Sequence, residues 1–226
     1  MNRILLNCVI SILFFFLTVV CIRFIAVFRS KKDNGNAESF FLKPSVKQMF
    51  FYGVIFVMNI IAGVLLEVFF KDNSVLFIFS RLTVLLIMQV AAYFDLKSYI
   101  IPNQIIVFGL AARAVLLFFE LIYANEGLLQ SVIEQLISAV ALTIGGVICS
   151  FIMKNGFGMG DVKLFALVGL FFGATGSFTI IFMSLLVSFF FSVFMLVTKR
   201  KEKKDVIPFA PCVLLGSWVA IIFFGV

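Results

Sequence analysis

Long apolar runs alternate with short polar segments along the whole chain. A helix that crosses a bilayer needs about 20 apolar residues. We expect eight such spans, near residues 4–28, 48–70, 74–94, 103–123, 129–153, 161–174, 176–198 and 207–225. The sixth span is short, because a helix of that length covers only ~20 Å at about 1.5 Å per residue. The pattern predicts an all-α fold: a polytopic bundle of about eight transmembrane helices.

Composition strengthens this prediction. Hydrophobic residues make up 63% of the chain and charged residues 13%, whereas soluble domains are about half apolar and a quarter charged. The excess apolar surface must face lipid, so we expect the bilayer as a partner. The first run is too long for the core of a signal peptide, and no small-x-small cleavage pattern follows it. We therefore expect it to remain as a span.

Lys and Arg residues concentrate in alternate polar segments, and cytoplasmic loops carry such an excess. The basic segments are 29–47, 95–102, 154–163 and 199–206. We expect these four segments on the cytoplasmic side of the cell membrane, with both termini outside. The net charge of +7 is then a topology signal, and we expect no nucleic acid as a partner.

The chain lacks residues that several kinds of catalytic and metal-binding site require. The chain has no histidine, which excludes a Ser-His-Asp triad, a Cys-His dyad and an H-E-x-x-H zinc site. The cysteines form no C-x-x-C pair, so we expect them to be small packing residues. They are Cys8, Cys21, Cys149 and Cys212. We expect no metal and no cofactor.

Ionisable side chains at membrane depth are costly and therefore candidates for function. Those in or beside the spans are Arg23, Glu67, Arg81, Asp95, Arg113 and Asp161. We expect Arg23 and Glu67 to reach the membrane interface, and Arg81 and Arg113 to pair with carboxylates or line the bundle.

Asp95 and Asp161 differ from the others because each lies where a span meets the expected cytoplasmic face. One span enters that face at Asp95 and another leaves it at Asp161. Two carboxyl groups at one depth can share a proton and activate a water molecule. Alternatively, each aspartate is an interfacial charge or a helix cap.

The residues around both aspartates favour the first interpretation. Alternate glycines at 156–160 precede Asp161 and would let a substrate backbone approach closely. No strand precedes them, so a phosphate-binding loop is not indicated. After Asp95, Pro102 disfavours helix at the preceding residue and ends the third span nearby. We expect Asn103 to cap the next helix, giving a short ordered loop.

Three segments together resemble the type IV prepilin peptidases. The first is Ala92-Tyr93-Phe94-Asp95 followed by Ile101-Pro102-Asn103, and the second is GFGMGDVKL at 156–164, with Gly169 and Gly173 in similar register. The third is Ile207-Pro208-Phe209-Ala210-Pro211. The resemblance implies a membrane aspartic endopeptidase that removes the leader of prepilins or pilin-like secretion subunits of type IV pilus and protein secretion systems. It implies that Asp95 and Asp161 are catalytic, and that Gly158 and Gly160 match the G-x-G glycines.

The chain departs from many members of that family in its N-terminal part. Those members carry a cytoplasmic domain with paired C-x-x-C motifs, linked to N-methylation of the new pilin terminus. Here residues 1–47 are expected to form one span and a short basic loop without cysteine in the loop, and 48–226 the peptidase domain. We therefore expect no methyltransferase activity.

Two other functions remain open from the sequence. A transporter could use the two aspartates as ion or proton sites, although no inverted repeat is evident. A presenilin-like protease shares G-x-G-D, but its P-A-L element is missing.

If the chain is a peptidase, the helix dipole at the start of the sixth span favours a charged Asp161. We therefore expect the shared proton mainly on Asp95.

Overall fold

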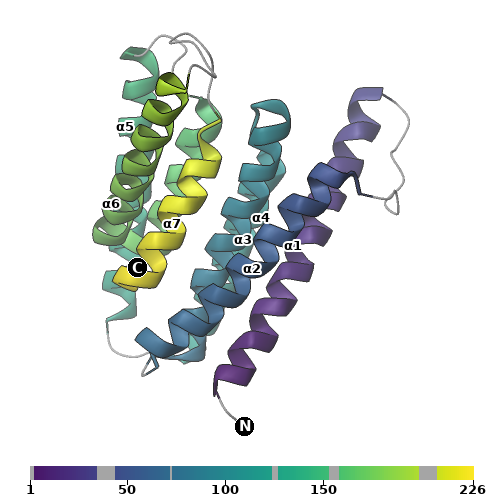
Figure 1. Cartoon of the computed structure of the whole chain (residues 1–226). Helices are drawn as coiled ribbons and strands as arrows, with labels where there is room; N and C mark the ends of the chain where they lie inside the picture. The colour runs from purple at the N-terminus through teal and green to yellow at the C-terminus, as the bar shows by residue number, and fades with distance from the viewer. Residues whose placement is uncertain (1–2, 35–43, 72, 124–126, 153–157, 199–207) are drawn as a thin grey trace. The chain divides into compact units, whose positions relative to one another are not determined.

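The computed structural model describes residues 3–34, 44–71, 73–123, 127–152, 158–198 and 208–226. All regular secondary structure within these ranges is α-helical, which confirms the expected fold class. The helices are α1 (Arg3–Asn34), α2 (Val46–Phe69), α3 (Val75–Ser98), α4 (Asn103–Ile122), α5 (Leu128–Ile152), α6 (Met159–Val197) and α7 (Ala210–Phe224) (Figure 1). Helices α1 to α6 are long and apolar enough to cross a membrane, and α7 is a shorter apolar helix.

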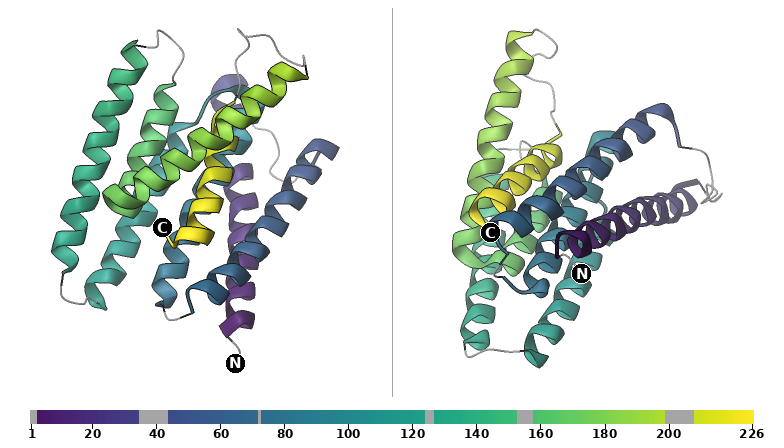
Figure 2. Two further views of the ribbon diagram at one scale, coloured as in Figure 1. Left: turned by 60° about the vertical axis from the view of Figure 1, so that its left-hand side comes forward. Right: turned by 60° about the horizontal axis from the view of Figure 1, so that its bottom comes forward.

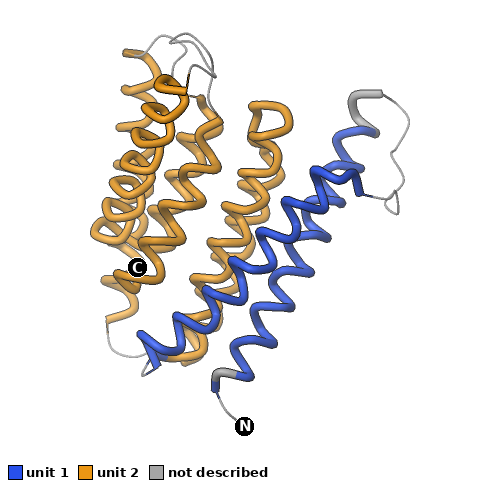
Figure 3. Tube along the Cα trace, viewed as in Figure 1, with its two compact units in different colours: residues 1–73 blue, residues 74–226 orange. Residues whose placement is uncertain are grey.

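The chain divides into two compact units (Figure 3). Unit 1 is Met1–Asn73 and contains α1 and α2, whereas unit 2 is Ser74–Val226 and contains α3 to α7. Both expected aspartates belong to unit 2. The start of the peptidase domain at residue 48 stays a prediction.

In unit 1 the two helices pack closely through small and polar residues. A Cβ atom at Gly63 would lie 2.0 Å from Ser11 Oγ and 3.1 Å from the Asn7 carbonyl oxygen, so this glycine favours the close approach of α2 to α1. One turn further along α2, Glu67 is buried, and Asn7 Nδ2 donates a hydrogen bond to its Oε2 atom at 2.6 Å. The expectation that Glu67 reaches the interface is therefore wrong, because its carboxylate pairs with an amide across the hairpin.

Helix α3 is the most buried of the long helices of unit 2. Every residue from Leu82 to Asp95 is buried, whereas α4, α5 and α6 expose rows of large apolar side chains. A helix that is apolar on all sides belongs in a core, and the exposed rows of the outer helices fit a lipid environment. Asp95 thus stands at the end of the most buried helix of the unit.

Helix α6 contains a sharp break at Gly173. This residue has φ 65° and ψ −163°, outside the helical region, and separates an arm of residues 159–172 from an arm of residues 174–197. Only glycine adopts such a conformation readily. The two arms correspond to the sixth and seventh expected spans, with the break at 173.

The second arm of α6 runs back toward the end where the first arm began. Near the start of the first arm, the ring of Phe165 contacts that of Phe209, just before α7. A Cβ atom at Gly216 would meet the Ser184 backbone at 2.5 Å, and one at Gly176 would meet Val226 at 2.6 Å. Residue numbers fall in α6 as they rise in α7, so this arm and α7 are antiparallel, as Figure 2 shows.

Two arginines lie at the other end of unit 2, and each binds the carbonyl of a helix end. Arg113 Nε donates to the Leu170 carbonyl at 2.9 Å, just before the break in α6. Arg113 also forms an ion pair with Glu120 at 2.9 Å, as expected from the sequence. Arg81 Nη2 donates to the carbonyl of Gly225, directly after α7, at 3.3 Å. Both cations therefore satisfy carbonyl groups that a helix leaves unpaired.

Candidate active site

Asp95 lies in the last turn of α3, which ends at Ser98. Tyr99 follows in the left-handed conformation, with φ 53°, and its N–H donates to the backbone carbonyl of Asp95 at 2.8 Å. Asp95 itself is only 7% exposed. Its Oδ2 atom accepts a hydrogen bond from the backbone N–H of Ala210 at 2.9 Å, and the backbone of Phe209 also bonds to this carboxyl group.

Asp161 lies in the first turn of α6 and is half-buried. Gly158 is the N-cap residue, and Asp161 is the third helical residue. Its carboxyl group bonds to the backbone of Gly158, which is the second half of a capping box. A Cβ atom at Gly158 would lie 3.0 Å from Asp161 Oδ2. Glycine therefore leaves room for the carboxylate to fold back onto the helix start.

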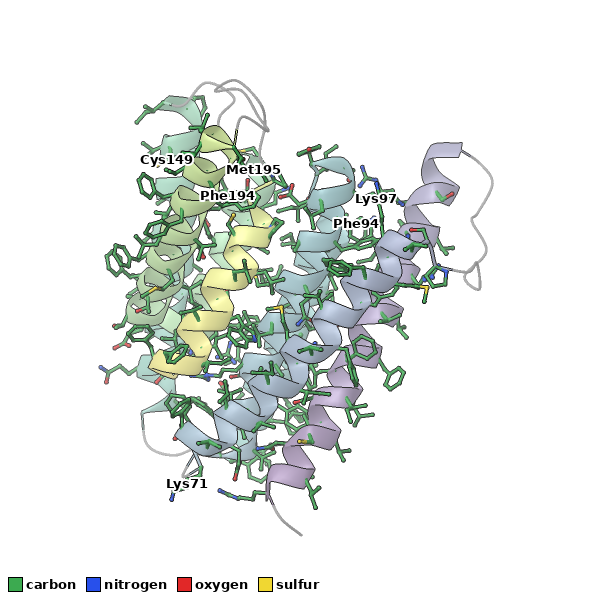
Figure 4. All side chains as sticks on the ribbon, in the orientation of Figure 1. Lys71, Phe94, Lys97, Cys149, Phe194 and Met195 are labelled. Atoms are coloured by element: carbon green, nitrogen blue, oxygen red, sulfur yellow. The ribbon has the colours of Figure 1, made fainter. Side chains whose placement is uncertain are left out.

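The end of α3 and the start of α6 meet at one end of unit 2. A Cβ atom at Gly160 would lie 3.1 Å from the Ile101 Cβ atom, so the loop after α3 rests against the first turn of α6. The charge of Asp95 acts electrostatically on Asp161. In Figure 4, Phe94 and Lys97 lie toward the end of unit 2 that also holds Cys149 of α5. The structure therefore places the two aspartates at the same end of unit 2, and their pairing as a catalytic dyad stays a prediction.

The loop between α3 and α4 differs in detail from the expectation. Helix α4 begins at Asn103, its N-cap residue is the buried Pro102, and no side chain caps it. The expected cap by Asn103 is therefore wrong. Instead, the Asn103 Oδ1 atom accepts a hydrogen bond from Lys163 Nζ at 2.9 Å. This bond joins the start of α4 to the start of α6 on an exposed surface.

The start of α7 is the part of the site that sequence reasoning did not assign. Phe209 is the N-cap residue of α7, and its ring contacts that of Phe165 edge-to-face, with centroids 5.9 Å apart. Phe165 lies one turn after Asp161 on the same face of α6. The signal available in the sequence was Pro211, since proline is favoured in the first turn of a helix. Of the motif residues, Gly156, Phe157 and Ile207 lie outside the described residues.

The arrangement can support general acid–base chemistry. Two carboxyl groups that repel each other retain one proton between them most readily, so one can accept a proton while the other donates one. The described residues contain no group of three or more His, Cys, Asp or Glu side chains placed to hold a metal ion.

A cavity of about 1230 Å³ opens elsewhere, at the opposite end of unit 2. It lies between the start of α3, the end of α4 and the start of α5, and Ser74, Tyr123 and Leu128 are among its lining residues. No residue of the aspartate motifs lines it. The aspartates therefore do not depend on this cavity.

Comparison with known proteins identifies one peptidase family. The model of the type IV leader peptidase family matches residues 82–197, which include both aspartates. A prepilin leader peptidase/N-methyltransferase of Bacillus subtilis (strain 168) is 31% identical over 151 residues, 65% of this chain. The chain spans 56% of the length of that relative. No solved structure matches the chain.

Proposed function

The chain belongs to the type IV leader peptidase family, and from this premise we propose that it is a membrane aspartic endopeptidase. Its substrates are type IV prepilins or pilin-like proteins, from which it removes the leader peptide. The observation that carries the proposal is the meeting of Asp95 and Asp161 at adjoining helix ends, where each is bonded to backbone groups. An ionised and a protonated carboxyl group are what water-mediated hydrolysis of a peptide requires.

The reaction needs no group other than water and the two carboxyls. The ionised carboxylate takes a proton from water as the water oxygen bonds to the scissile carbonyl carbon. The protonated carboxyl gives its proton to the carbonyl oxygen, which yields a tetrahedral diol. When the C–N bond breaks, the leaving nitrogen receives the proton taken from water, and one hydroxyl of the diol returns its proton to the other carboxylate, which restores the starting pair. We propose that the enzyme uses no metal or cofactor, so a chelator should leave cleavage intact.

A cleavage assay tests the proposal directly. The purified protein in nanodiscs is incubated with a synthetic peptide that joins a basic prepilin leader to the start of the mature apolar helix. We expect a single cut at the junction, identified by mass spectrometry, and none with the double variant Asp95→Asn/Asp161→Asn. Glu134→Gln is the matched control, because Glu134 is an exposed carboxylate on α5 at the opposite end of unit 2. Equal cleavage by the double variant would refute the proposal, and no cleavage by the wild type would favour a transporter.

We further propose that the aspartates face the cytoplasm, because the basic segments border the ends of α3 and α6. Lys97→Cys, in the last turn of α3, should resist impermeant thiol reagents in intact cells when the native cysteines are replaced. Lys71→Cys, in the segment between α2 and α3, should react. The reverse labelling pattern would place the site on the outer side.

We also propose that the processed product keeps an unmethylated terminus. The basic segment 29–47 contains no cysteine, in contrast to the C-x-x-C domain linked to methylation. Mass spectrometry of the cleaved product in the presence of a methyl donor would reveal an added methyl group, and that result would contradict this part of the proposal.

A further inference from the structure

We propose that the first turn of α7 is a working part of the active site. The backbone N–H groups of Phe209 and Ala210 hold Asp95 in its ionised form, so that Asp95 acts as the base and Asp161 as the acid. This inference rests on the proposed peptidase function and adds to it a role for a segment that lies outside the matched range 82–197. It also reverses the sequence-based expectation that the proton rests on Asp95.

The contact itself favours a charged Asp95. The Ala210 N–H donates to Asp95 Oδ2 at 2.9 Å, and the Phe209 backbone bonds to the same carboxyl. An ionised carboxylate only accepts hydrogen bonds, and N–H bonds to it are stronger than those to the neutral acid. Ala210 is the first residue of α7, so its N–H has no acceptor within the helix and the helix dipole adds positive potential.

Two prolines direct both donors to one acceptor. Pro208 precedes Phe209 and Pro211 follows Ala210. Because proline has no backbone N–H, the only donors among these four residues are those of Phe209 and Ala210, and both bond to Asp95. The next N–H, that of Cys212, already donates to the Phe209 carbonyl at 2.9 Å. The sequence of this turn thus leaves Asp95 as its anionic partner.

Asp161 is the other candidate for the negative charge. Among the residues that the structure describes, the backbone of Gly158 bonds to its carboxyl group, and the charge of Asp95 acts on it. The dipole of α6 favours an ionised Asp161. The dipole of α7 favours an ionised Asp95, although Asp95 lies in the last turn of α3, whose own dipole opposes a negative charge. When the pair carries a single negative charge, the N–H bonds from the start of α7 outweigh this opposition and hold the charge on Asp95. The shared proton is then on Asp161.

Other ionisable groups near Asp95 do not alter this balance. Helix α7 brings only Cys212, on which the charge of Asp95 acts. The first arm of α6 brings Asp161 and Lys163, and Lys163 donates to Asn103. Helix α4 carries Arg113 and Glu120, which pair with each other toward the far end of unit 2. On α3 itself, Lys97 is exposed and Arg81 lies in the helix's opposite half.

Removing a single N–H group tests the inference. Replacing Ala210 with lactic acid converts the amide to an ester, which deletes the donor to Asp95 and also weakens the Phe209 carbonyl as an acceptor for the N–H groups of Cys212 and Val213. The control is the same change at Val213, with 2-hydroxyisovaleric acid, because the Val213 N–H donates to the Phe209 carbonyl at 3.1 Å within the same turn. A lost hydrogen bond to a charged group predicts that the acidic limb of the pH–rate profile moves up by about one pH unit.

The control ester should leave that limb where it is. Equal profiles for the two esters would overturn the inference, and so would a loss of rate at Ala210 with no movement of the limb, which marks a structural role. Since the pair titrates as a unit, site assignment needs a second measurement. In Asp161→Asn protein labelled at its aspartate carboxyl carbons, NMR should show Asp95 ionising at a higher pH with the Ala210 ester than without it.

The NMR titration does not require cleavage, so it remains decisive if the peptidase proposal fails. An unchanged Asp95 titration overturns the inference while the cleavage assay judges the function separately. In the unmodified protein at its pH of greatest activity, the labelled Asp161 carbon should show the protonated form. A protonated Asp95 at that pH would also overturn the inference.

Discussion

The two ends of unit 2 treat buried charge in opposite ways. At one end, Asp95 and Asp161 each bond to backbone groups at the start of a helix, α7 and α6 respectively. At the other end, Arg113 and Arg81 donate to carbonyls at the end of a helix arm. Each charge thus lies beside the end of another helix or helix arm whose dipole favours it, although Asp95 also lies at the unfavourable end of its own helix α3.

The difference between the ends is in how the charges are compensated. Arg113 has a carboxylate partner in Glu120, to which both terminal guanidinium nitrogens donate, at 2.9 and 3.1 Å. At the aspartate end, the charge of Asp95 instead acts on a second carboxyl group, that of Asp161. A compensated cluster stabilises the fold, whereas an uncompensated pair retains reactivity at some cost in stability. We therefore expect the arginine end to serve stability, whereas the proposed function assigns the chemistry to the aspartate end.

The largest effect is expected from neutralising one aspartate. Asp95→Asn or Asp161→Asn should lower the cleavage rate by at least about a thousandfold, because neither role in the pair can be filled by an amide. The melting temperature, followed by the fluorescence of Trp218, should stay equal or rise, because the like-charge repulsion is gone. A variant that melts much earlier than the wild type would show that the aspartates are structural.

At the arginine end, Arg113→Met should show the opposite pattern. It leaves Glu120 and the Leu170 carbonyl without their cation, at a cost of about 3 kcal/mol in the free energy of unfolding. Adding Glu120→Gln should recover part of the loss, and Lys97→Met, which removes an exposed lysine, should cost far less. Below its melting temperature, Arg113→Met should still cleave. Abolished cleavage in a folded Arg113→Met protein would contradict the separation of the two ends.

A smaller loss of stability is expected at the break in α6. Gly173→Ala places a side chain on a backbone with φ 65° and ψ −163°, at a cost of about 1–3 kcal/mol. Space is not the cause, since the nearest atom to the new Cβ would be Gln135 Cγ at 3.9 Å. Gly145→Ala on α5 is the control, because it also meets open space but in an ordinary helix. Equal thermal stability of the two variants would refute the strain argument.

Much of the fold was predictable because the apolar runs are long and charge punctuates them. The sixth and seventh expected spans match the two arms of α6, and the short first arm ends at Gly173. The sequence could not show how closely the two arms of α6 join at Gly173. The turn there depends on one glycine conformation, and Arg113 donates to the Leu170 carbonyl that the break leaves without a helical partner. Glu67 was misjudged for a similar reason, since its partner Asn7 lies on another helix.

The site was predictable in its parts but not in its connections. Position alone brought Asp95 and Asp161 to one face. The expected proton position considered only the helices that carry the aspartates, whereas the structure adds a third helix start at Ala210. Asn103 was expected as a cap because its residue type favours that role, but tertiary contact with Lys163 prevails. Contacts between distant segments are what a single sequence conceals.

The smallest effect is expected from the exposed bond between Lys163 and Asn103, which ties α6 to α4 beside the aspartates. Exposed contacts of this kind contribute up to about 1 kcal/mol. Lys163→Met and Asn103→Ala should each slow cleavage about two- to threefold, by loosening the first turn of α6 that positions Asp161.

Because both variants break the same bond, the double variant should be no slower than either single variant. Lys97→Met, which changes an exposed lysine of α3 near the same end, controls for the loss of positive charge. If Lys163→Met alone loses about a hundredfold in rate while Asn103→Ala is unaffected, then Lys163 acts on the substrate itself. The aspartate end would then contain a compensating cation after all, and its contrast with the arginine end would fail.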